Sequence, residues 1–299
     1  MSHISSSPAR WLRERLRARG LLVAPGVFDG LSARIAAEAG FEALYASGGA
    51  IARSAGLPDL GLLSLTEVVT RIREIVDATA LPVIADADAG YGNALSVIRT
   101  VREFERAGVA ALHLEDQVTP KKCGHYPGKQ LVAADEFVDK LRAALDARRD
   151  PDLVIIARTD ARAVLGLDAA IERARRYAEA GADVLFVEAP ESEEELERIA
   201  RTLPGPLLVN MFAGGKTPLV APARLEALGY RIMIVPSDLQ RAAIAAMQEA
   251  AALVRATGTA TGMGDRLASF AERDRLVGLA AWEERERRYG TASRGEAAR

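Results

Sequence analysis

The stretch PVIADADAGYGNALSVIRTVREFERAGVAALHLED, residues 82–116, decides the fold of this chain. It begins and ends with a short apolar run, 82–88 and 111–116, and each run finishes in acidic residues. Between them, the apolar side chains of 94–107 repeat with the 3.6-residue period of an amphipathic helix. Gly108 follows that segment, as a helix C-terminus often requires. The stretch therefore predicts a strand, a helix and a second strand.

The same alternation continues in both directions along the chain. Eight short apolar or β-rich runs are predicted strands: 22–27, 42–47, 82–88, 111–116, 153–158, 184–189, 207–211 and 231–236. Helical periodicity fills the seven intervals: 31–39, 64–79, 94–107, 134–147, 168–180, 193–202 and 221–228. Eight strands alternating with helices over about 235 residues predict an α/β protein with a (β/α)8 TIM barrel. A doubly wound open sheet is the alternative, but no dinucleotide-type glycine fingerprint follows the first strand.

Further helices are predicted outside this repeat. A short basic helix at 9–19 would plug or flank the N-terminal end of the barrel, and 238–257 would be the eighth helix. We expect residues 1–262 to form the catalytic barrel and 263–299 a helical extension with a polar tail. The extension holds helix candidates at 265–279 and 281–289 that the barrel does not need. They are expected to pack on another surface or subunit, or else on their own barrel.

The composition is that of an ordinary soluble globular protein, with 299 residues, 49% hydrophobic, 27% charged and a net charge of -2. Arginines interleave with acidic residues on helix faces, so the sequence gives no sign of a nucleic-acid partner. No apolar run approaches the ~18 residues of a membrane span, and the N-terminus lacks the apolar segment of a signal peptide. A single cysteine excludes an intramolecular disulfide and fits a reducing compartment. We therefore expect a cytoplasmic protein without a membrane partner.

The string KKCGH at 121–125 places this cysteine among lysines and a histidine. Neighbouring cations stabilise a thiolate, so Lys121, Lys122 and a charged His125 would lower the pKa of Cys123. The alternative is that Cys123 is only a small buried apolar residue. The surrounding residues 119–129 are predicted to be neither strand nor helix, which favours chemistry over packing.

Acidic residues stand at the ends of the third and fourth predicted strands. In a TIM barrel the C-terminal strand ends carry the active site. Asp86 and Asp88 lie two apart, hence on one face of a strand, and two converging carboxylates favour a cation between them. Glu115 and Asp116 add further oxygen ligands, which suit Mg2+ and would also accept Mn2+. Asp116 has the alternative of pairing with a lysine or capping the next segment.

Other strand ends carry groups suited to an acidic substrate. Ser47 and the backbone of Gly48 and Gly49 could hold a carboxylate, or could simply form a tight turn. Arg158 could fork onto a substrate carboxylate, or could pair with Asp160 or Glu188.

Two more polar side chains fall in or beside the strand runs. Asn210 would orient a substrate oxygen or hold a loop. His113 lies inside a strand pattern and is predicted to be a satisfied core histidine.

Several chemistries are excluded by what the sequence lacks. All five lysines fall outside the predicted strands, which argues against a Schiff-base aldolase with a buried lysine. The Cys-Gly-His string is too sparse for a zinc site. Residues 214–217 lack the earlier glycine and the strand-to-helix setting of a phosphate-binding loop.

With these residues placed, the chain resembles the isocitrate lyase and phosphoenolpyruvate mutase superfamily over nearly its whole length. The resemblance rests on SGG at 47–49, GLPDLG at 56–61, DADAGYG at 86–92, LEDQ at 114–117, KKCGH at 121–125, ARTDA at 157–161, and NM at 210–211 followed by GGKTP at 214–218. It implies a TIM barrel assembled as a homotetramer with C-terminal helices exchanged between subunits. It also implies Mg2+ held by Asp86 and Asp88, with Asp59 and Glu115 acting through water.

KKCGH is typical of the carbon-carbon lyases of that superfamily, whereas the mutase and phosphonate-hydrolysing branches lack the cysteine. The resemblance thus implies a Mg2+-dependent lyase. It would cleave a 2-hydroxy di- or tricarboxylate, of the dimethylmalate or methylisocitrate type, to a 2-oxo acid and a second carboxylic acid. The GGKTPL string resembles the dimethylmalate lyase and oxaloacetate hydrolase group. Asp238, after Pro236-Ser237, would repel a third substrate carboxylate, which favours a dicarboxylate.

The resemblance assigns a role to each candidate residue. Tyr45 or a nearby carboxylate would remove the hydroxyl proton, and Cys123 would protonate the carbanion after bond cleavage, its thiolate balanced by Lys122 and His125. The substrate-binding set is Ser47, Gly48, Gly49, Arg158, Gly124, His125, Glu188 and Asn210. The loop 119–129 would close over the site. Hydrolysis or decarboxylation of oxaloacetate at the same metal, and a non-catalytic barrel that binds a metal and a dicarboxylate, remain as alternatives.

Overall fold

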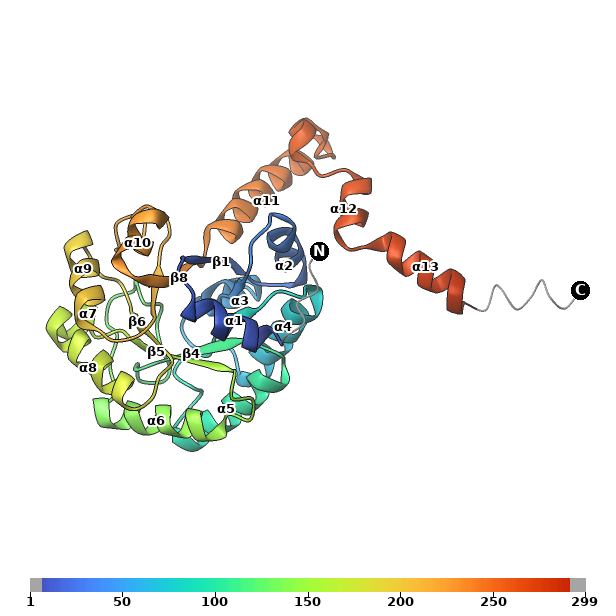
Figure 1. The fold of residues 1–299 in the computed structure, drawn as a ribbon. Helices are drawn as coiled ribbons and strands as arrows, with labels where there is room; N and C mark the ends of the chain where they lie inside the picture. Colours follow the sequence, from blue (N-terminus) through green and yellow to red (C-terminus); the bar gives the residue numbers. More distant parts are fainter. Residues whose placement is uncertain (1–6, 291–299) are drawn as a thin grey trace, which may run out of the picture. The chain divides into compact units, whose positions relative to one another are not determined.

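The computed structural model describes residues 7–290, and its centre is a closed barrel of eight parallel strands (Figure 1). Each strand pairs with the next in sequence, and the eighth pairs with the first. The strands are β1 Leu22–Val27, β2 Leu44–Ala46, β3 Val83–Asp86, β4 Ala111–Glu115, β5 Val154–Thr159, β6 Val184–Val187, β7 Leu207–Asn210 and β8 Tyr230–Val235. The prediction of a TIM barrel is confirmed, and the doubly wound alternative is wrong.

Between the strands, helices surround this barrel in chain order, with one further helix before β1 and one directly after β8 in the sequence. They are α1 Pro8–Arg17, α2 Gly30–Glu38, α3 Gly48–Ser54, α4 Leu65–Ala78, α5 Ala94–Arg106, α6 Ala134–Ala147, α7 Arg162–Leu165, α8 Leu167–Glu179, α9 Glu193–Thr202, α10 Pro222–Leu228 and α11 Asp238–Thr257. Every helix predicted for the barrel is present. The short helices α3 and α7 were not predicted, because four to seven residues are too few to show a period.

The barrel interior is built by the two-residue period of its strands. On β4, Ala111 belongs to the inner apolar cluster while Leu112 packs outward against the helices. The inner layers are filled by small and branched residues, among them Ala24, Ile84, Ile156 and Phe186. Beyond these layers, toward the C-terminal strand ends, the same inward positions turn polar. The sequence period therefore carries charged side chains into the barrel mouth.

Helix α1 closes the opposite end of the barrel. Leu12 and Leu16 belong to the inner cluster, and Leu12 is 0% exposed. The guanidinium of Arg13 donates to the carbonyls of Asp152 and Leu153 and to the Asp183 carboxylate, just before β5 and β6. Of the two placements predicted for this helix, the plug is the one observed.

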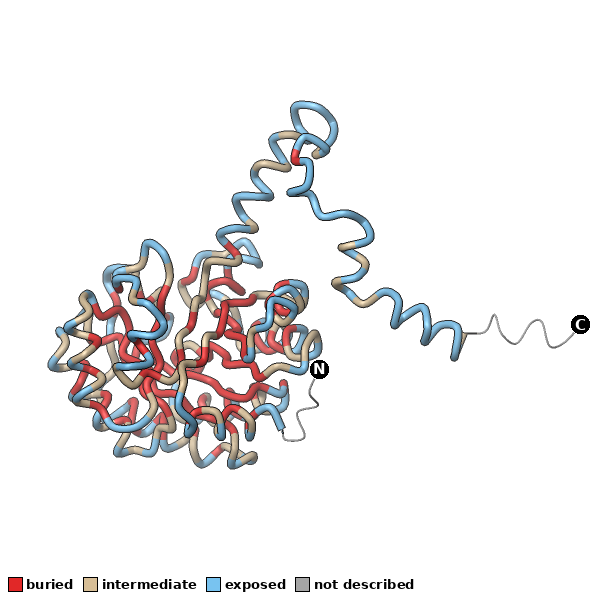
Figure 2. Tube along the Cα trace, turned by 45° about the horizontal axis from the view of Figure 1, so that its top comes forward, coloured by how far each residue is buried: buried red, intermediate tan, exposed pale blue. Residues whose placement is uncertain are grey.

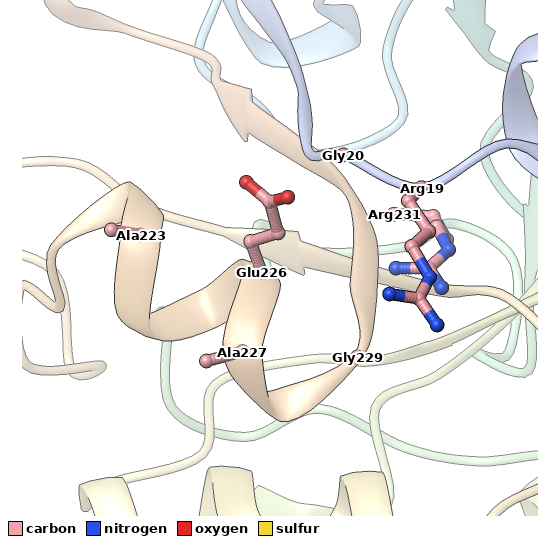
Figure 3. A pocket seen from close by; sticks show the side chains of 7 residues that line it. All are labelled: Arg19, Gly20, Ala223, Glu226, Ala227, Gly229 and Arg231. Atoms are coloured by element: carbon pink, nitrogen blue, oxygen red, sulfur yellow. The ribbon is translucent and has the colours of Figure 1, made fainter.

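A pocket of about 440 Å³ lies beside this closed end (Figure 3). It is formed by Arg19 and Gly20 before β1, by α10, and by Arg231 of β8. Arg19 and Arg231 stand on one side of it and Glu226 on the other. The pocket adjoins the N-terminal strand ends, where barrel enzymes do not carry their chemistry.

The chain divides into two compact units at Arg241. After α11, the second unit holds a 3-10 helix at Thr261–Arg266, α12 at Phe270–Leu276 and α13 at Leu279–Tyr289. The single helix predicted at 265–279 is therefore wrong. Gly264 adopts φ 56 and interrupts the helical conformation between α11 and α12. The predicted domain boundary at residue 262 remains a prediction, as does the structure of 291–299, which lies outside the described residues.

Most residues of the second unit are exposed (Figure 2). They include large apolar side chains, with Phe270 76% and Trp282 61% exposed. Large exposed apolar surface is characteristic of faces that bind another protein. Among the described residues, no helix is long and apolar enough to cross a membrane.

Replacing Leu12 by alanine should destabilise the fold by about 3 kcal/mol, because the side chain fills the closed end of the barrel and leaves a cavity. Urea denaturation followed by circular dichroism measures the change. Arg17→Ala on the exposed face of the same helix is the control and should change stability by less than about 0.5 kcal/mol. Equal effects of the two substitutions would show that α1 does not plug the barrel.

Candidate active site

Strand pairing brings the polar inward positions together at the C-terminal mouth of the barrel. Asp86 on β3 lies opposite His113 on β4, and Glu115 on β4 lies opposite Arg158 on β5. Tyr45 on β2, Glu188 after β6 and Asn210 on β7 complete the ring. All of these side chains are buried.

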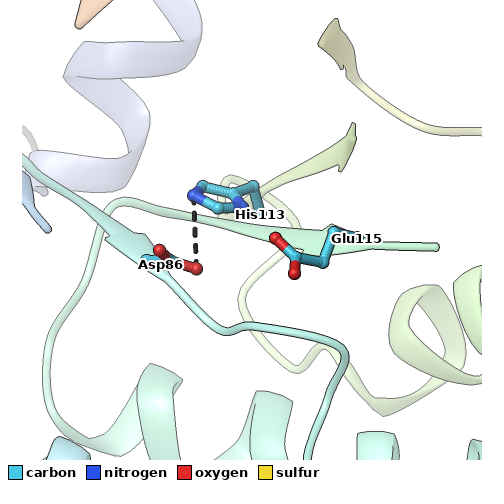
Figure 4. Close-up of side chains that lie close together, drawn as sticks. All are labelled: Asp86, His113 and Glu115. Carbon is cyan, nitrogen blue, oxygen red and sulfur yellow. Dashed lines mark ion pairs between the residues drawn. The ribbon is translucent and has the colours of Figure 1, made fainter. Parts of the chain in front are cut away.

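Asp86, His113 and Glu115 form the one group of this kind among residues 7–290 whose ligand atoms lie close enough to hold a metal ion, all within 4.8 Å of one another (Figure 4). Nε2 of His113 is 3.5 Å from Oδ1 of Asp86 and 2.9 Å from the Tyr45 hydroxyl. Both carboxylate oxygens of Glu115 are buried without a hydrogen-bond partner. Carboxylate and imidazole groups are suitable ligands for a divalent cation, and the Glu115 oxygens have no hydrogen bond to give up, so the residues fit a metal.

The ionisation of these groups follows from burial and from their neighbours. Burial lowers the pKa of His113 to about 4, so the imidazole is neutral at pH 7. Burial would raise the pKa of Asp86, but His113, Lys121 and Arg158 outweigh it and hold the value at about 2. Burial raises the pKa of Glu115 well above its usual value, although Arg158 opposes this.

His113 is thus a site residue that the sequence prediction missed. It is fully buried, as expected, but its Nδ1 has no partner, so it is not a satisfied core histidine. One signal was available: His113 lies two residues before Glu115 on the same strand and must share its inward face.

Asp59 and Asp88 both form ion pairs with the ammonium group of Lys121. Its Nζ lies 2.6 Å from Oδ1 of Asp59 and 2.8 Å from Oδ1 of Asp88. Burial raises the pKa of Asp88 to about 6, with Lys121 opposing and Asp86 adding to the rise. The four predicted metal ligands therefore form two pairs. Asp86 and Glu115 belong to the metal-type cluster, whereas Asp59 and Asp88 form ion pairs with Lys121.

Asp88 reaches this position through a turn rather than along a strand. β3 ends at Asp86, and Asp88 has the positive φ of 47. Its backbone N–H donates to Oδ1 of Asp86 at 3.0 Å. The expectation that both aspartates lie on one strand face is wrong, although the turn still brings them close together. The positive φ could not be predicted from residue type, because aspartate seldom adopts it.

Arg158 lies among three carboxylates. Its Nε is 3.0 Å from Asp160, 3.3 Å from Glu115 and 3.8 Å from Glu188. Burial opposes charge on the guanidinium, but Asp160, Glu115 and Glu188 raise the pKa of Arg158 well above its usual value. The salt-bridge alternative is the one the structure shows.

The Ser47-Gly48-Gly49 turn lies directly against the carboxylates. Ser47 caps α3 by accepting from the N–H of Ala50 at 3.4 Å. A Cβ on Gly48 would come within 2.6 Å of Asp86 Oδ2, and one on Gly49 within 2.7 Å of Asp59 Oδ2. Glycine is required at both positions because the backbone approaches these oxygens so closely.

Cys123 lies in the loop 119–129, which forms neither helix nor strand. Its backbone N–H donates to the carbonyl of Asp59 at 3.1 Å. Next to it, a Cβ on Gly124 would come within 2.5 Å of Arg158 Nη2 and 2.6 Å of Glu188 Cγ. The loop therefore packs closely against the mouth of the barrel and brings the thiol there.

The expected lowering of the Cys123 pKa is wrong. Burial raises the pKa of Cys123 to about 11, with the Asp59 carboxylate adding to the rise. The cations that were expected to lower the pKa of Cys123 either form ion pairs with carboxylates or lie elsewhere in the loop. Lys121 is paired with Asp59 and Asp88, while Nζ of Lys122 lies over Gly128. The thiol therefore keeps its proton at neutral pH, as a proton donor must.

His125 links the loop to two other strand ends. Its Nε2 is 2.9 Å from Oε1 of Glu188, and its Nδ1 accepts from the N–H of Lys216 at 3.2 Å. Its ring stands edge-on to Phe212, with centroids 4.7 Å apart. Asn210 donates from Nδ2 to Oε1 of Glu188 at 3.2 Å. Loops 119–129 and 212–218 thus meet over the same carboxylate.

Buried polar atoms without partners mark the space that a ligand would fill. Among the described residues they include Tyr91 Oη, His113 Nδ1, Glu115 Oε1 and Oε2, Glu188 Oε2, Asn210 Oδ1 and Thr217 Oγ1. Buried polar groups in proteins are nearly always hydrogen-bonded, so a set at a barrel mouth indicates a polar ligand or an ion.

Asp116 has a different task from its neighbour Glu115. Its carboxylate accepts from the hydroxyls of Thr159 and Tyr177, the backbone N–H of Asp160 and the guanidinium of Arg173. It is fully buried by these donors, so it stabilises the packing of β4, β5 and α8. Asp116 is therefore paired rather than placed in the metal-type cluster, and its cationic partner is Arg173, not the lysine that was expected.

The fold and the site together define a TIM-barrel enzyme with an acidic metal-type centre and a loop cysteine. A profile of the family described as phosphoenolpyruvate phosphomutase matches residues 12–255. The chain belongs to this family.

Its relatives include carbon-carbon lyases. The chain is 48% identical over 281 residues to the 2,3-dimethylmalate lyase of Eubacterium barkeri, covering 94% of this chain and 97% of the relative. It is 45% identical over 279 residues to the 2-methylisocitrate lyase of Aeropyrum pernix, covering 93% of this chain and 90% of the relative.

Solved structures agree with this placement. A crystal structure of 2,3-dimethylmalate lyase, described as a member of the PEP mutase/isocitrate lyase superfamily, superposes with a TM-score of 0.91 at 40% identity, covering 96% of this chain and 97% of that one. Oxaloacetate acetylhydrolase in complex with the inhibitor 3,3-difluorooxalacetate superposes with a TM-score of 0.89 at 39% identity, covering 95% and 97% of the two chains.

Asp116→Ala should lower the free energy of unfolding by about 3 kcal/mol, because it leaves the buried donors of Thr159, Tyr177 and Arg173 without their acceptor. Urea denaturation measures the loss. Asp135→Ala removes an exposed carboxylate that pairs with Arg176 and should cost less than about 1 kcal/mol. A small effect at Asp116 would contradict its structural role.

Proposed function

We propose that this chain is a Mg2+-dependent carbon-carbon lyase that cleaves a 2-hydroxy dicarboxylate to a 2-oxo acid and a second carboxylic acid. The observation that carries the proposal is the position of the chain's one cysteine. The Cys123 loop packs against the barrel mouth that holds the metal-type cluster. The named relatives, which are lyases, support the same reaction class.

Asp86 and Glu115 are the residues proposed to hold the ion, with Asp59 and Asp88 acting at longer range. The Glu115 oxygens, which accept no hydrogen bond although Arg158 lies 3.3 Å from one of them, support this choice, and Mn2+ would satisfy the same ligands. When bound, the ion makes a substrate hydroxyl more acidic and offsets the charge of the adjacent carboxylate.

Tyr45 is the proposed group that removes the hydroxyl proton. Burial and the Asp86 carboxylate raise the pKa of Tyr45, so the phenol is protonated at pH 7. It can accept a proton only by giving its own to a neighbour, and His113 Nε2 lies 2.9 Å away. In the tautomer with Nε2 unprotonated, the neutral imidazole accepts that proton. The relay is balanced, with one proton entering at Tyr45 and one arriving at His113.

Cys123 is the proposed donor to the carbanion that cleavage leaves. The thiol carries its proton because burial raises its pKa to about 11. The resulting thiolate is stabilised by the backbone N–H of His125 and by Lys121. Lys121 thus takes the charge-balancing role first assigned to Lys122.

The substrate carboxylates would be bound by Arg158 and by the Ser47, Gly48 and Gly49 backbone, with Gly124, His125, Glu188 and Asn210 around the departing fragment. For this, Arg158 must exchange part of its contact with Glu115 and Glu188 for the substrate. Loop 119–129 excludes water from the carbanion while it is closed.

A dicarboxylate is proposed on the strength of the GGKTPL string and the dimethylmalate lyase relative. Asp238 adds little to this choice, because it is 44% exposed and lies 3.7 Å from Arg241. Hydrolysis of oxaloacetate is the second candidate, and the superposition with oxaloacetate acetylhydrolase favours it.

Purified protein with Mg2+ should convert 2,3-dimethylmalate to a 2-oxo acid and a second carboxylic acid. Proton NMR measures the formation of both products. Methylisocitrate, isocitrate and oxaloacetate are screened in parallel. Cys123→Ser should lower turnover at least about 100-fold, because it removes the proton donor. Chelation of the metal should abolish turnover in the wild type.

Other outcomes separate the alternatives. Oxalate plus acetate from oxaloacetate would establish the hydrolase, and pyruvate alone would establish a decarboxylase. Wild-type turnover by Cys123→Ser would show that the thiol is not the donor. Inactivity toward all four compounds would contradict the lyase proposal and favour a binding role.

A homotetramer with exchanged C-terminal helices is proposed for the assembly. Two observations support it: the outward residues of β8 are only half-buried, and α11 to α13 expose apolar side chains such as Met247 and Trp282. A reducing cytoplasm as the compartment stays a prediction from the single cysteine.

Light scattering after size exclusion should therefore give the mass of four 31.9 kDa chains. Trp282→Asp together with Phe270→Asp should shift the mass toward smaller species, because both side chains would lose their apolar partner surface. A wild-type monomer would contradict the proposed assembly.

A further inference from the structure

The two peptide carbonyls that flank Cys123 are each held by a buried side chain. Gln117 donates from Nε2 to the carbonyl of Lys122 at 2.8 Å, and its Oε1 accepts from the N–H of Lys122 at 3.0 Å. On the other side, the Lys129 ammonium donates to the carbonyl of Gly124. Gln117 is 1% exposed, and so is the side chain of Lys129.

Gln117 is attached to the rigid part of the barrel. It follows β4 by two residues and forms an antiparallel bridge with Leu131. Val118 N–H donates to the Gln130 carbonyl at 2.9 Å, and Val132 N–H donates to the Asp116 carbonyl at 3.0 Å. These bonds tie the two ends of the loop together, so the Gln117 carboxamide projects from a fixed base.

Lys129 is fixed in a similar way. Its Nζ is 2.8 Å from Oδ1 of Asp160. Asp160 is itself held, since it accepts from Arg158 and donates its backbone N–H to Asp116. The ammonium therefore connects the carbonyl of Gly124 to the end of β5.

The segment around Cys123 needs such external support. Gly124 and Gly128 give the loop backbone extra freedom, and Gly124 cannot be replaced because it packs against Arg158 and Glu188. Pro120 is exposed, and the one ring contact of residues 119–125 is that of His125 with Phe212. The position of this stretch depends on polar contacts, and buried ones are costly to leave unmade.

We propose that Gln117 and Lys129 are positioning residues that hold the backbone on both sides of Cys123 and so fix the direction from which its thiol gives a proton. Neither side chain belongs to the substrate-binding or metal set. Gln117 contacts the loop backbone alone, whereas Lys129 also pairs with Asp160 at the end of β5. The role in proton transfer rests on the proposed lyase function, whereas the control of the thiol itself does not.

The test uses Gln117→Met and Lys129→Met in the full-length protein. Because Cys123 is the one cysteine of the chain, the rate of alkylation by iodoacetamide reports on this loop alone. Each variant should raise that rate about tenfold, since loss of the buried hydrogen bonds lets the loop open. Each should also lower kcat about tenfold and change KM less than about twofold. Lys129→Arg, which can donate to both partners, should restore most of kcat.

Gln240→Met is the matched control. Gln240 is 5% exposed, donates to the Ala50 carbonyl at 2.7 Å and accepts from Arg53 at 2.9 Å. It loses a comparable pair of buried hydrogen bonds away from the loop, so it should lower Tm without changing the alkylation rate.

Two results would overturn the proposal: alkylation and kcat unchanged in both methionine variants, or the same rise in alkylation in Gln240→Met. The second result would indicate general loosening of the fold. If the wild type turned over no substrate, the lyase function would fail, and the alkylation rates alone would decide whether Gln117 and Lys129 hold the thiol.

Discussion

The rest of this structure depends on the need to pair charges inside a closed barrel. Strand alternation sends every second side chain into a lumen that water does not fill, and at the C-terminal end these side chains are acidic. Isolated buried carboxylates would be prohibitively costly. Each is therefore matched by a cation, an imidazole or a hydroxyl, or is left ready for a metal ion.

The cations that complete this pairing come from two kinds of element, a barrel strand and a loop. Arg158 stands on a strand and reaches Asp160, Glu115 and Glu188. Lys121 and Lys129 stand on the loop 119–129 and reach Asp59, Asp88 and Asp160. The contacts that hold the loop at the mouth, and the cysteine with it, therefore also balance the charge of the carboxylates there. Buried pairs of this kind add little net stability, but removing one partner of a pair is costly because it leaves an uncompensated buried charge.

The strands and long helices could be predicted from the sequence because their signals are local. The run 193–202 shows its period within ten residues, and the helix occupies those bounds. The inward carboxylates could be predicted as well, since the two-residue period fixes their direction. The predictions that were wrong concerned properties that depend on contacts between residues far apart in the sequence. The raised pKa of Cys123 arises from burial by the folded loop and from Asp59, sixty-four residues earlier in the chain. The pairing of Lys121 with Asp59 could not be predicted for the same reason, whereas the positive φ of Asp88 is a local conformation that its residue type does not reveal.

The plug helix α1 has a consequence for synthesis on the ribosome. Arg13 finds its partner Asp183 only 170 residues further along the chain. At about 5–20 residues per second, α1 emerges roughly 10–30 s before that partner is made. During this interval its apolar face, with Leu12 and Leu16, has no barrel to cover. Helix α1 is therefore made well before it can find its place, and the nascent chain exposes this amphipathic segment to chaperones throughout that interval.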